Sequence, residues 1–131
     1  MKIAIVHSDY YPEITKGLVS GVYNEAKSCD VSFEEFVVFG VMEIPLKVMR
    51  LMKSQRFDAV IALGCVIKGE TGHYDVIQNT VPSCLMSLSL EFDVPIAHGI
   101  LFVNNIDQAF ARCSDDRNKG GEAFRAIESL L

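Results

Sequence analysis

The sequence predicts a three-layer, doubly wound α/β sandwich with a four-stranded parallel sheet. Apolar runs rich in β-branched and aromatic residues alternate along the chain with segments of helical periodicity, which is typical of this class. One of these runs, AVIALGCVI, is apolar without a break, as expected for a strand covered on both faces. With 131 residues, half of them apolar and 22% charged, the chain fits a single domain over 1–131.

The elements alternate in the order β-α-β-α-β-α-β-α-α, so right-handed crossovers connect the strands. We expect strands at 2–7, 31–39, 57–67 and 94–103. The first helix, 12–28, has Pro12 near its start and an apolar face with four-residue spacing: Ile14, Leu18, Val22 and Ala26.

The next helix covers 43–54 and has basic residues near its end, where the helix dipole favours them. A long helix over 74–92 contains Pro82, which predicts a kink or a restart. A short helix near 105–113 and a final one at 118–131 complete the fold.

Composition excludes several classes of protein. A formal charge of −5 and a pI near 5.1 argue against a nucleic-acid binder. No apolar run reaches the roughly 18 residues of a membrane span, and the N-terminus lacks a secretory signal, so we expect a cytoplasmic protein. The cysteines lie far apart and form no cluster with histidine, so we expect small apolar fillers and no metal site: Cys29, Cys65, Cys84 and Cys113.

Ligands of doubly wound sheets bind at the carboxyl ends of the strands, which here are 8–11, 40–43, 68–73 and the segment from Phe102 onward. The strongest candidate is the segment 64–74, GCVIKGETGHY. Gly69 and Gly72 allow close backbone approach and unusual dihedral angles, and the following helix start offers N–H groups to an anion. His73 would add a general acid or base. A capped loop with a solvent-facing histidine is the alternative.

Three further groups have both a functional and a structural interpretation. Glu43 could contact a ligand or simply favour a helix start. Arg112, near Asn118-Lys119-Gly120, could hold a phosphate or be a surface charge at a helix end. Tyr10 could stack on a heterocycle or be an exposed interface aromatic.

Five motifs in one register resemble the lumazine synthase family. They are GVMEIP (40–45), LGCVIKGETGHY (63–74), VPIAHGIL (94–101), QAFAR (108–112) and NKG (118–120). The resemblance covers nearly the whole chain and implies a flavodoxin-like fold. It also implies a transferase of riboflavin biosynthesis that needs no metal and no cofactor. Such an enzyme condenses 5-amino-6-(D-ribitylamino)uracil with 3,4-dihydroxy-2-butanone 4-phosphate to 6,7-dimethyl-8-ribityllumazine, releasing phosphate and water.

The resemblance also implies roles for residues. His73 would be the proton donor and acceptor, and Glu70, Thr71 and Arg112 would bind phosphate. Lys119 would come from a neighbouring subunit. The pyrimidine and ribityl group would be held by Tyr10, Val41, Met42, Glu43, Cys65, Val66, Ile67 and His98, the last at a position completed across a subunit boundary.

The chain departs from the family pattern at several of these positions. Lys68 replaces an arginine, Tyr10 a phenylalanine and His98 an aromatic residue, while Asp9 stands where a basic residue is common. Glu70 places a carboxylate beside the phosphate site, so its side chain would have to turn away and leave the binding to backbone N–H groups.

The family forms pentamers, and members that build a sixty-subunit shell usually carry an N-terminal extension. This chain begins at its first strand, so we expect a pentamer, or two paired into a decamer, over a shell. Assembly would bury apolar area along Met42 to Met52. A riboflavin synthase is a candidate functional partner.

Two alternatives remain. One is a non-catalytic member of the same fold that binds a flavin or lumazine without turnover. The other is a response-regulator receiver, which needs an Asp at the end of the third strand, where this chain has Lys68-Gly69.

Overall fold

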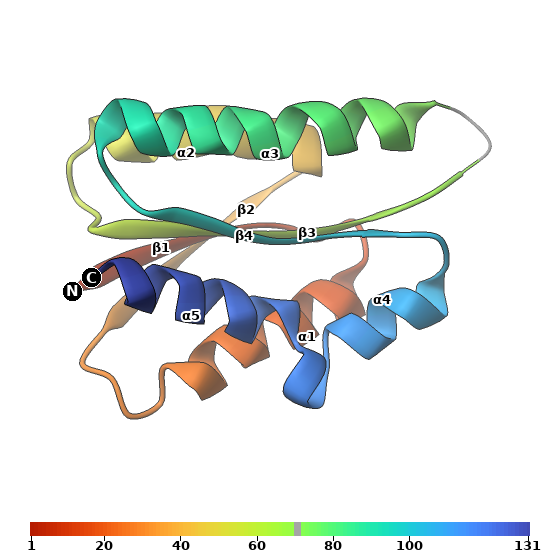
Figure 1. The fold of residues 1–131 in the computed structure, drawn as a ribbon, viewed down its shortest axis with the longest axis horizontal. Helices are drawn as coiled ribbons and strands as arrows, with labels where there is room; N and C mark the ends of the chain where they lie inside the picture. Colours follow the sequence, from red (N-terminus) through yellow and green to blue (C-terminus); the bar gives the residue numbers. More distant parts are fainter. Residues whose placement is uncertain (70–71) are drawn as a thin grey trace.

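The computed structural model describes residues 1–69 and 72–131. Its strands form a single parallel sheet in the order β2-β1-β3-β4, which confirms the predicted architecture. Helices cover both faces of this sheet and make a three-layer sandwich (Figure 1). The strands are β1 (Lys2–Ser8), β2 (Ser32–Val38), β3 (Ala59–Ile67) and β4 (Ile96–Val103).

Figure 1 shows α2 and α3 on one face of the sheet and α1, α4 and α5 on the other. Both chain termini lie at the end opposite to the carboxyl ends of the strands. The helices are α1 (Pro12–Glu25), α2 (Ile44–Lys53), α3 (His73–Phe92), α4 (Ile106–Arg112) and α5 (Lys119–Leu130), with 3-10 turns η1 (Val41–Glu43) and η2 (Asp115–Arg117).

The central strands β1 and β3 are buried along almost their whole length because each is covered on both faces. In β3, Ile61, Leu63 and Cys65 pack with α1 and α5, whereas Val60, Ala62 and Val66 pack with α2 and α3. The edge strand β2 is only half-buried, although its sequence reads as a strand like the others. The predicted face of α1, from Ile14 to Ala26, is buried as expected.

The helix α3 runs without interruption through Pro82, so the predicted restart is wrong. A proline in a helix removes one backbone N–H donor, and its usual acceptor is the carbonyl four residues earlier. That residue is Gln78, which is exposed, so water can take the place of the missing donor. Burial of Ile77, Val81 and Leu85 on the inner face holds the helix against the sheet.

Asn118 joins α5 to the rest of the molecule. Its side-chain oxygen accepts hydrogen bonds from the backbone of Gly120 (2.8 Å) and Gly121 (3.3 Å) and so caps the helix. Its amide donates to the carbonyls of Gly17 and Cys113, both at 2.9 Å. A Cβ on Gly120 would lie 2.0 Å from the Leu18 carbonyl oxygen, so only glycine permits this packing of α5 on α1.

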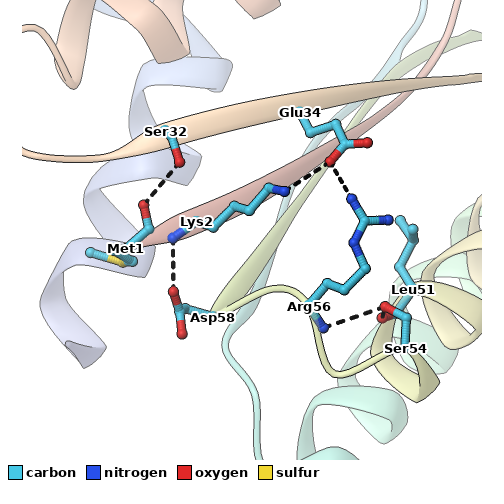
Figure 2. A network of polar contacts seen from close by, with 8 residues as sticks. All are labelled: Met1, Lys2, Ser32, Glu34, Leu51, Ser54, Arg56 and Asp58. Atoms are coloured by element: carbon cyan, nitrogen blue, oxygen red, sulfur yellow. Dashed lines mark hydrogen bonds and ion pairs between the residues drawn. The ribbon is translucent and has the colours of Figure 1, made fainter.

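The amino ends of β1, β2 and β3 are tied together at the sheet edge far from the candidate site (Figure 2). One carboxylate oxygen of Glu34 receives Lys2 Nζ at 3.2 Å and Arg56 Nη2 at 2.6 Å. The backbone N–H of Lys2 donates to Asp58 at 2.7 Å. These partners are partly exposed, so each pair contributes modestly, but together they fix the sheet's register at this end.

Candidate active site

A cavity of about 650 Å³ opens at the carboxyl ends of β1, β2 and β3, where the predicted site lies. It brings together segments that lie far apart in the sequence. Eight of the predicted site residues line it: Tyr10, Val41, Met42, Glu43, Cys65, Val66, Ile67 and His73. The cavity therefore lies where the carboxyl-end rule predicts a ligand site.

Tyr10 follows β1 at the mouth of the cavity. A buried hydrogen bond from Thr15 Oγ1 to the Ser8 carbonyl oxygen, 2.7 Å long, fixes the turn between β1 and α1. The Tyr10 ring is 69% exposed and meets Tyr11 edge to face, with the ring centroids 5.1 Å apart. Tyr10 therefore presents an open aromatic face to a flat ligand.

The segment after β2 forms the 3-10 turn η1, which leads directly into α2, and α2 matches the predicted helix 43–54 to within one residue at each end. Pro45 lies at the start of α2, where a proline is tolerated. Val41 is buried, whereas Met42 and Glu43 are exposed at the cavity. The turn thereby places one carboxylate beside an apolar wall.

The end of β3 offers backbone to the cavity. Strand β1 pairs with β3 only as far as Leu63, whereas β4 pairs with β3 as far as Ile67. Residues 64–67 therefore extend beyond β1, and the edge of β3 that faced β1 is open to a ligand. The Cys65 side chain packs on the α1 side, where burial raises its pKa to about 12 and keeps the thiol protonated.

His73 is the first residue of α3 and is exposed at the cavity. The next residue, Tyr74, packs edge to face on Phe102, with centroids 6.1 Å apart, and Lys68 Nζ lies 5.9 Å from the Tyr74 ring centroid. This cation–π contact keeps a positive charge near the helix start. The predicted phosphate residues Glu70 and Thr71 lie outside the described residues.

The expected unusual dihedral angles at Gly69 and Gly72 are wrong. No glycine in the described part of the chain has a positive φ, and Gly72 has φ −75° and ψ 7°. A Cβ at either position would meet no described atom within 4 Å. These glycines therefore leave open space around the backbone and do not adopt a strained backbone conformation.

Three other predicted residues do not line this cavity within one chain. Arg112 ends α4 on the opposite face of the sheet, is exposed, and donates from Nη1 to the Gln108 carbonyl oxygen at 3.1 Å. His98 and Lys119 line a second cavity of about 250 Å³ between β4 and α5. There, burial and the nearby Lys119 charge lower the pKa of His98.

Asp9, for which the sequence offered no explanation, pairs with His7. Their Oδ1 and Nδ1 atoms are 2.6 Å apart, and His7 Nε2 lies 3.3 Å from Glu35 Oε1. Tyr23 also donates to Glu35 at 2.9 Å. Asp9 thus stabilises a buried histidine on the α1 face instead of contributing to the candidate active site.

Five residues that line the cavity were not among the predicted site residues. Ser8 and Tyr11 lie within the expected segment 8–11 and Gly40 within 40–43, whereas Phe39 comes directly after β2 and Ile77 lies one helical turn after His73. The sequence signal for these residues was their position next to the predicted site residues.

Within residues 1–69 and 72–131, no group of three His, Cys, Asp or Glu side chains could hold a metal ion. In the same residues, no helix is long and apolar enough to cross a membrane.

The fold and the cavity define a protein of the doubly wound α/β class with a site for a small molecule. The chain belongs to the 6,7-dimethyl-8-ribityllumazine synthase family, whose sequence model matches residues 1–131. A 6,7-dimethyl-8-ribityllumazine synthase of Methylorubrum extorquens (strain PA1) is 39% identical over 136 residues, covering 99% of this chain and 79% of the relative.

Other relatives with the same name agree. The Coxiella burnetii (strain Dugway 5J108-111) protein is 37% identical, covering 99% of this chain and 89% of its own length. The Nitrosomonas europaea protein is 41% identical, covering 96% of this chain and 77% of its own length.

Proposed function

We propose that this chain, as one catalytic domain, makes 6,7-dimethyl-8-ribityllumazine from 5-amino-6-(D-ribitylamino)uracil and 3,4-dihydroxy-2-butanone 4-phosphate, releasing phosphate and water. Family membership over the whole chain supports the reaction. The observation that carries the assignment to this site is the cavity that joins Tyr10, Glu43 and His73. It offers a stacking surface, a carboxylate and an imidazole to two substrates held side by side.

The pyrimidine substrate occupies the β1–β3 side of the cavity in this proposal. Its ring stacks on Tyr10, and its polar edge bonds the open backbone of Cys65, Val66 and Ile67. The ribityl chain extends along Val41, Met42 and Glu43, where the carboxylate accepts hydrogen bonds from hydroxyl groups. A protonated Cys65 thiol takes no part in the chemistry.

His73 moves protons between the substrates. When the substrate amine attacks the ketone, water leaves, and phosphate elimination and ring closure each need further proton transfers. An imidazole is suited to both directions of transfer near neutral pH. Because His73 starts α3, it lies next to the segment proposed to hold the phosphate that leaves.

Phosphate binding combines the start of α3 with positive charge. Backbone N–H groups in the first turn of α3 and the Lys68 ammonium favour an anion there. The guanidinium of Arg112 can donate two parallel hydrogen bonds to a phosphate, which the ammonium of Lys68 cannot do. Since Arg112 lies on the other face of its own sheet, we assign the Arg112 at each site to a neighbouring copy of the chain.

A shared site requires a homo-oligomer, and we propose a pentamer or two pentamers paired into a decamer. Exposed apolar side chains at the cavity support such an assembly, because a neighbouring copy would bury them. Phe39 is 86% exposed, and Tyr10 and Met42 line the same cavity. The expected apolar face along Met42 to Met52 is mostly buried within the chain, and only Met42 and Leu46 stay exposed. Apolar residues of α3, Val76, Met86 and Leu90, extend the exposed surface instead.

His98 and Lys119 complete the neighbouring copy's contribution, and Glu70 and Thr71 complete the phosphate loop. A cytoplasmic location and a riboflavin synthase that accepts the product fit this proposal.

Mixing the protein with both substrates tests the function directly, because the lumazine product is fluorescent. Product formation supports the proposal. Ligand binding without turnover would favour a flavin- or lumazine-binding protein instead.

A further inference from the structure

The side-chain oxygen of Ser8 is a buried polar atom without a partner. Ser8 is 1% exposed, and its Oγ makes no hydrogen bond within the described residues. Buried hydroxyls are normally hydrogen-bonded, and leaving one unpaired opposes folding. The buried hydroxyl of Thr15 in α1 has the usual arrangement, since it donates to the carbonyl oxygen of Ser8. Ser8 therefore requires a specific explanation.

The position of Ser8 connects this oxygen with the cavity. Ser8 is the last residue of β1 and lines the cavity itself. Side chains alternate along a strand, so Ser8 shares the α2–α3 face with Val6. Its neighbour there is Gly64, where a Cβ would lie 3.6 Å from the Ser8 Cβ and 2.9 Å from a methyl carbon of Val41. The absence of a side chain at Gly64 thus lets Val41 pack close beside Ser8.

Ser8 lies near both regions of the proposed pyrimidine site. Val41, assigned to the ribityl chain, and Ser8 both lie next to Gly64, which is the first residue of β3 beyond its pairing with β1. The part of the substrate that joins these regions carries hydroxyl groups. A hydroxyl can both donate to and accept from serine, so it can pair with Ser8 whichever way its hydrogen points.

We propose that the Ser8 hydroxyl hydrogen-bonds a hydroxyl group of the ribityl chain and so helps to select a polyol-bearing pyrimidine. This inference rests on the proposed function, since it uses that substrate. Ser8 is then a specificity residue: the unpaired hydroxyl is tolerated in the free protein and is satisfied when the substrate binds. Its removal should weaken ligand binding without weakening the fold.

The test compares wild type and Ser8→Ala by fluorescence titration with two ligands. One is 6,7-dimethyl-8-ribityllumazine, and the other is a lumazine whose 8-alkyl chain lacks hydroxyls. We expect affinity for the ribityl ligand to fall about five- to tenfold, as for one lost hydrogen bond, and affinity for the alkyl ligand to stay within about twofold. Equal losses for both ligands, or no loss, would overturn the proposal.

Urea unfolding without ligand provides the structural control. The midpoint for Ser8→Ala should equal or exceed that of wild type, whereas Thr15→Val, which removes a bonded buried hydroxyl, should lower it. A clear loss of stability or failure to fold in Ser8→Ala would contradict an unpaired hydroxyl. Ser8→Cys, which keeps the shape but bonds weakly, should show the same ligand-dependent loss.

Turnover by wild type separates the two proposals. If wild type forms the lumazine while the Ser8 variants bind both ligands normally, only the role of Ser8 is wrong. If wild type binds the ribityl ligand but forms no product from the two substrates, the proposed function is wrong.

Discussion

His73 and Arg112 lie on opposite faces of the same sheet. His73 begins α3, which packs with α2, whereas Arg112 ends α4, which packs with α1 and α5 (Figure 1). In Figure 1, α3 begins at the edge formed by the carboxyl ends of the strands, whereas α4 begins near that edge and runs back along the sheet. In our proposal, one chain therefore contributes the imidazole to one site and the guanidinium to a site of another copy.

Replacing His73 by alanine should slow the chemical steps. We expect kcat to fall about 10²-fold or more, as for loss of a positioned acid–base group, with product affinity changed less than about threefold. Steady-state kinetics and fluorescence titration measure the two effects. If affinity collapsed while kcat stayed high, His73 would be a binding residue and not the proton carrier.

Replacing Arg112 by alanine should weaken use of the phosphate-bearing substrate. We expect its KM to rise about 10- to 100-fold, with little change for the pyrimidine substrate, because one charged two-pronged donor is lost. Arg112→Lys should recover only part of this loss. Arg125→Ala is the matched control, since Arg125 pairs with Glu25 on the surface. Equal increases for both substrates would rule out a phosphate-specific role.

His98 makes stability depend on pH. Burial and then the Lys119 charge lower its pKa in the folded state, and its Nδ1 accepts the backbone N–H of Ile100 at 3.3 Å. The unfolded chain binds the proton more readily, so His98 lowers stability as pH falls below about 6.5. Between pH 8 and 5.5, the urea midpoint of wild type should fall more than that of His98→Gln. Equal falls would contradict this assignment.

Replacing the half-buried Asn118 should lower the free energy of unfolding more than most substitutions near the surface do. Asn118→Ala removes a helix cap and two donated hydrogen bonds, so the free energy of unfolding should fall about 2–3 kcal/mol. Asn118→Asp keeps the cap acceptor but loses the donors, so its loss should be intermediate. Urea denaturation measures both, and a loss below about 0.5 kcal/mol for alanine would contradict the structural role.

The sheet was predictable because its signals are local. An unbroken apolar run such as AVIALGCVI requires cover on both faces, and the face from Ile14 to Ala26 requires a helix. Pro82 suggested a kink or restart, but α3 continues through it. The backbone hydrogen bond that Pro82 cannot donate would go to Gln78, which is exposed to solvent, and no sequence pattern reveals where such a loss is tolerated. The pairing of Asp9 with His7 depends on side chains that converge only after folding.

The candidate site was predictable only where it follows strand ends. Tyr10, Glu43 and His73 meet because parallel strands end at one edge. The NKG motif combines two roles that sequence cannot separate: Asn118 and Gly120 dock α5 on α1, while Lys119 lines the cavity with His98. In our proposal, Arg112 reaches a site through a contact between copies, and no local pattern in one chain encodes such a contact.

Subunit complementation tests the shared site most directly. His73→Ala and Arg112→Ala should each be nearly inactive. When the two variants are produced together and assemble at random, about a quarter of the interfaces should pair an intact His73 with an intact Arg112. We therefore expect about a quarter of wild-type activity in the mixed oligomer. Activity no higher than that of the separate variants would contradict a site built from two copies.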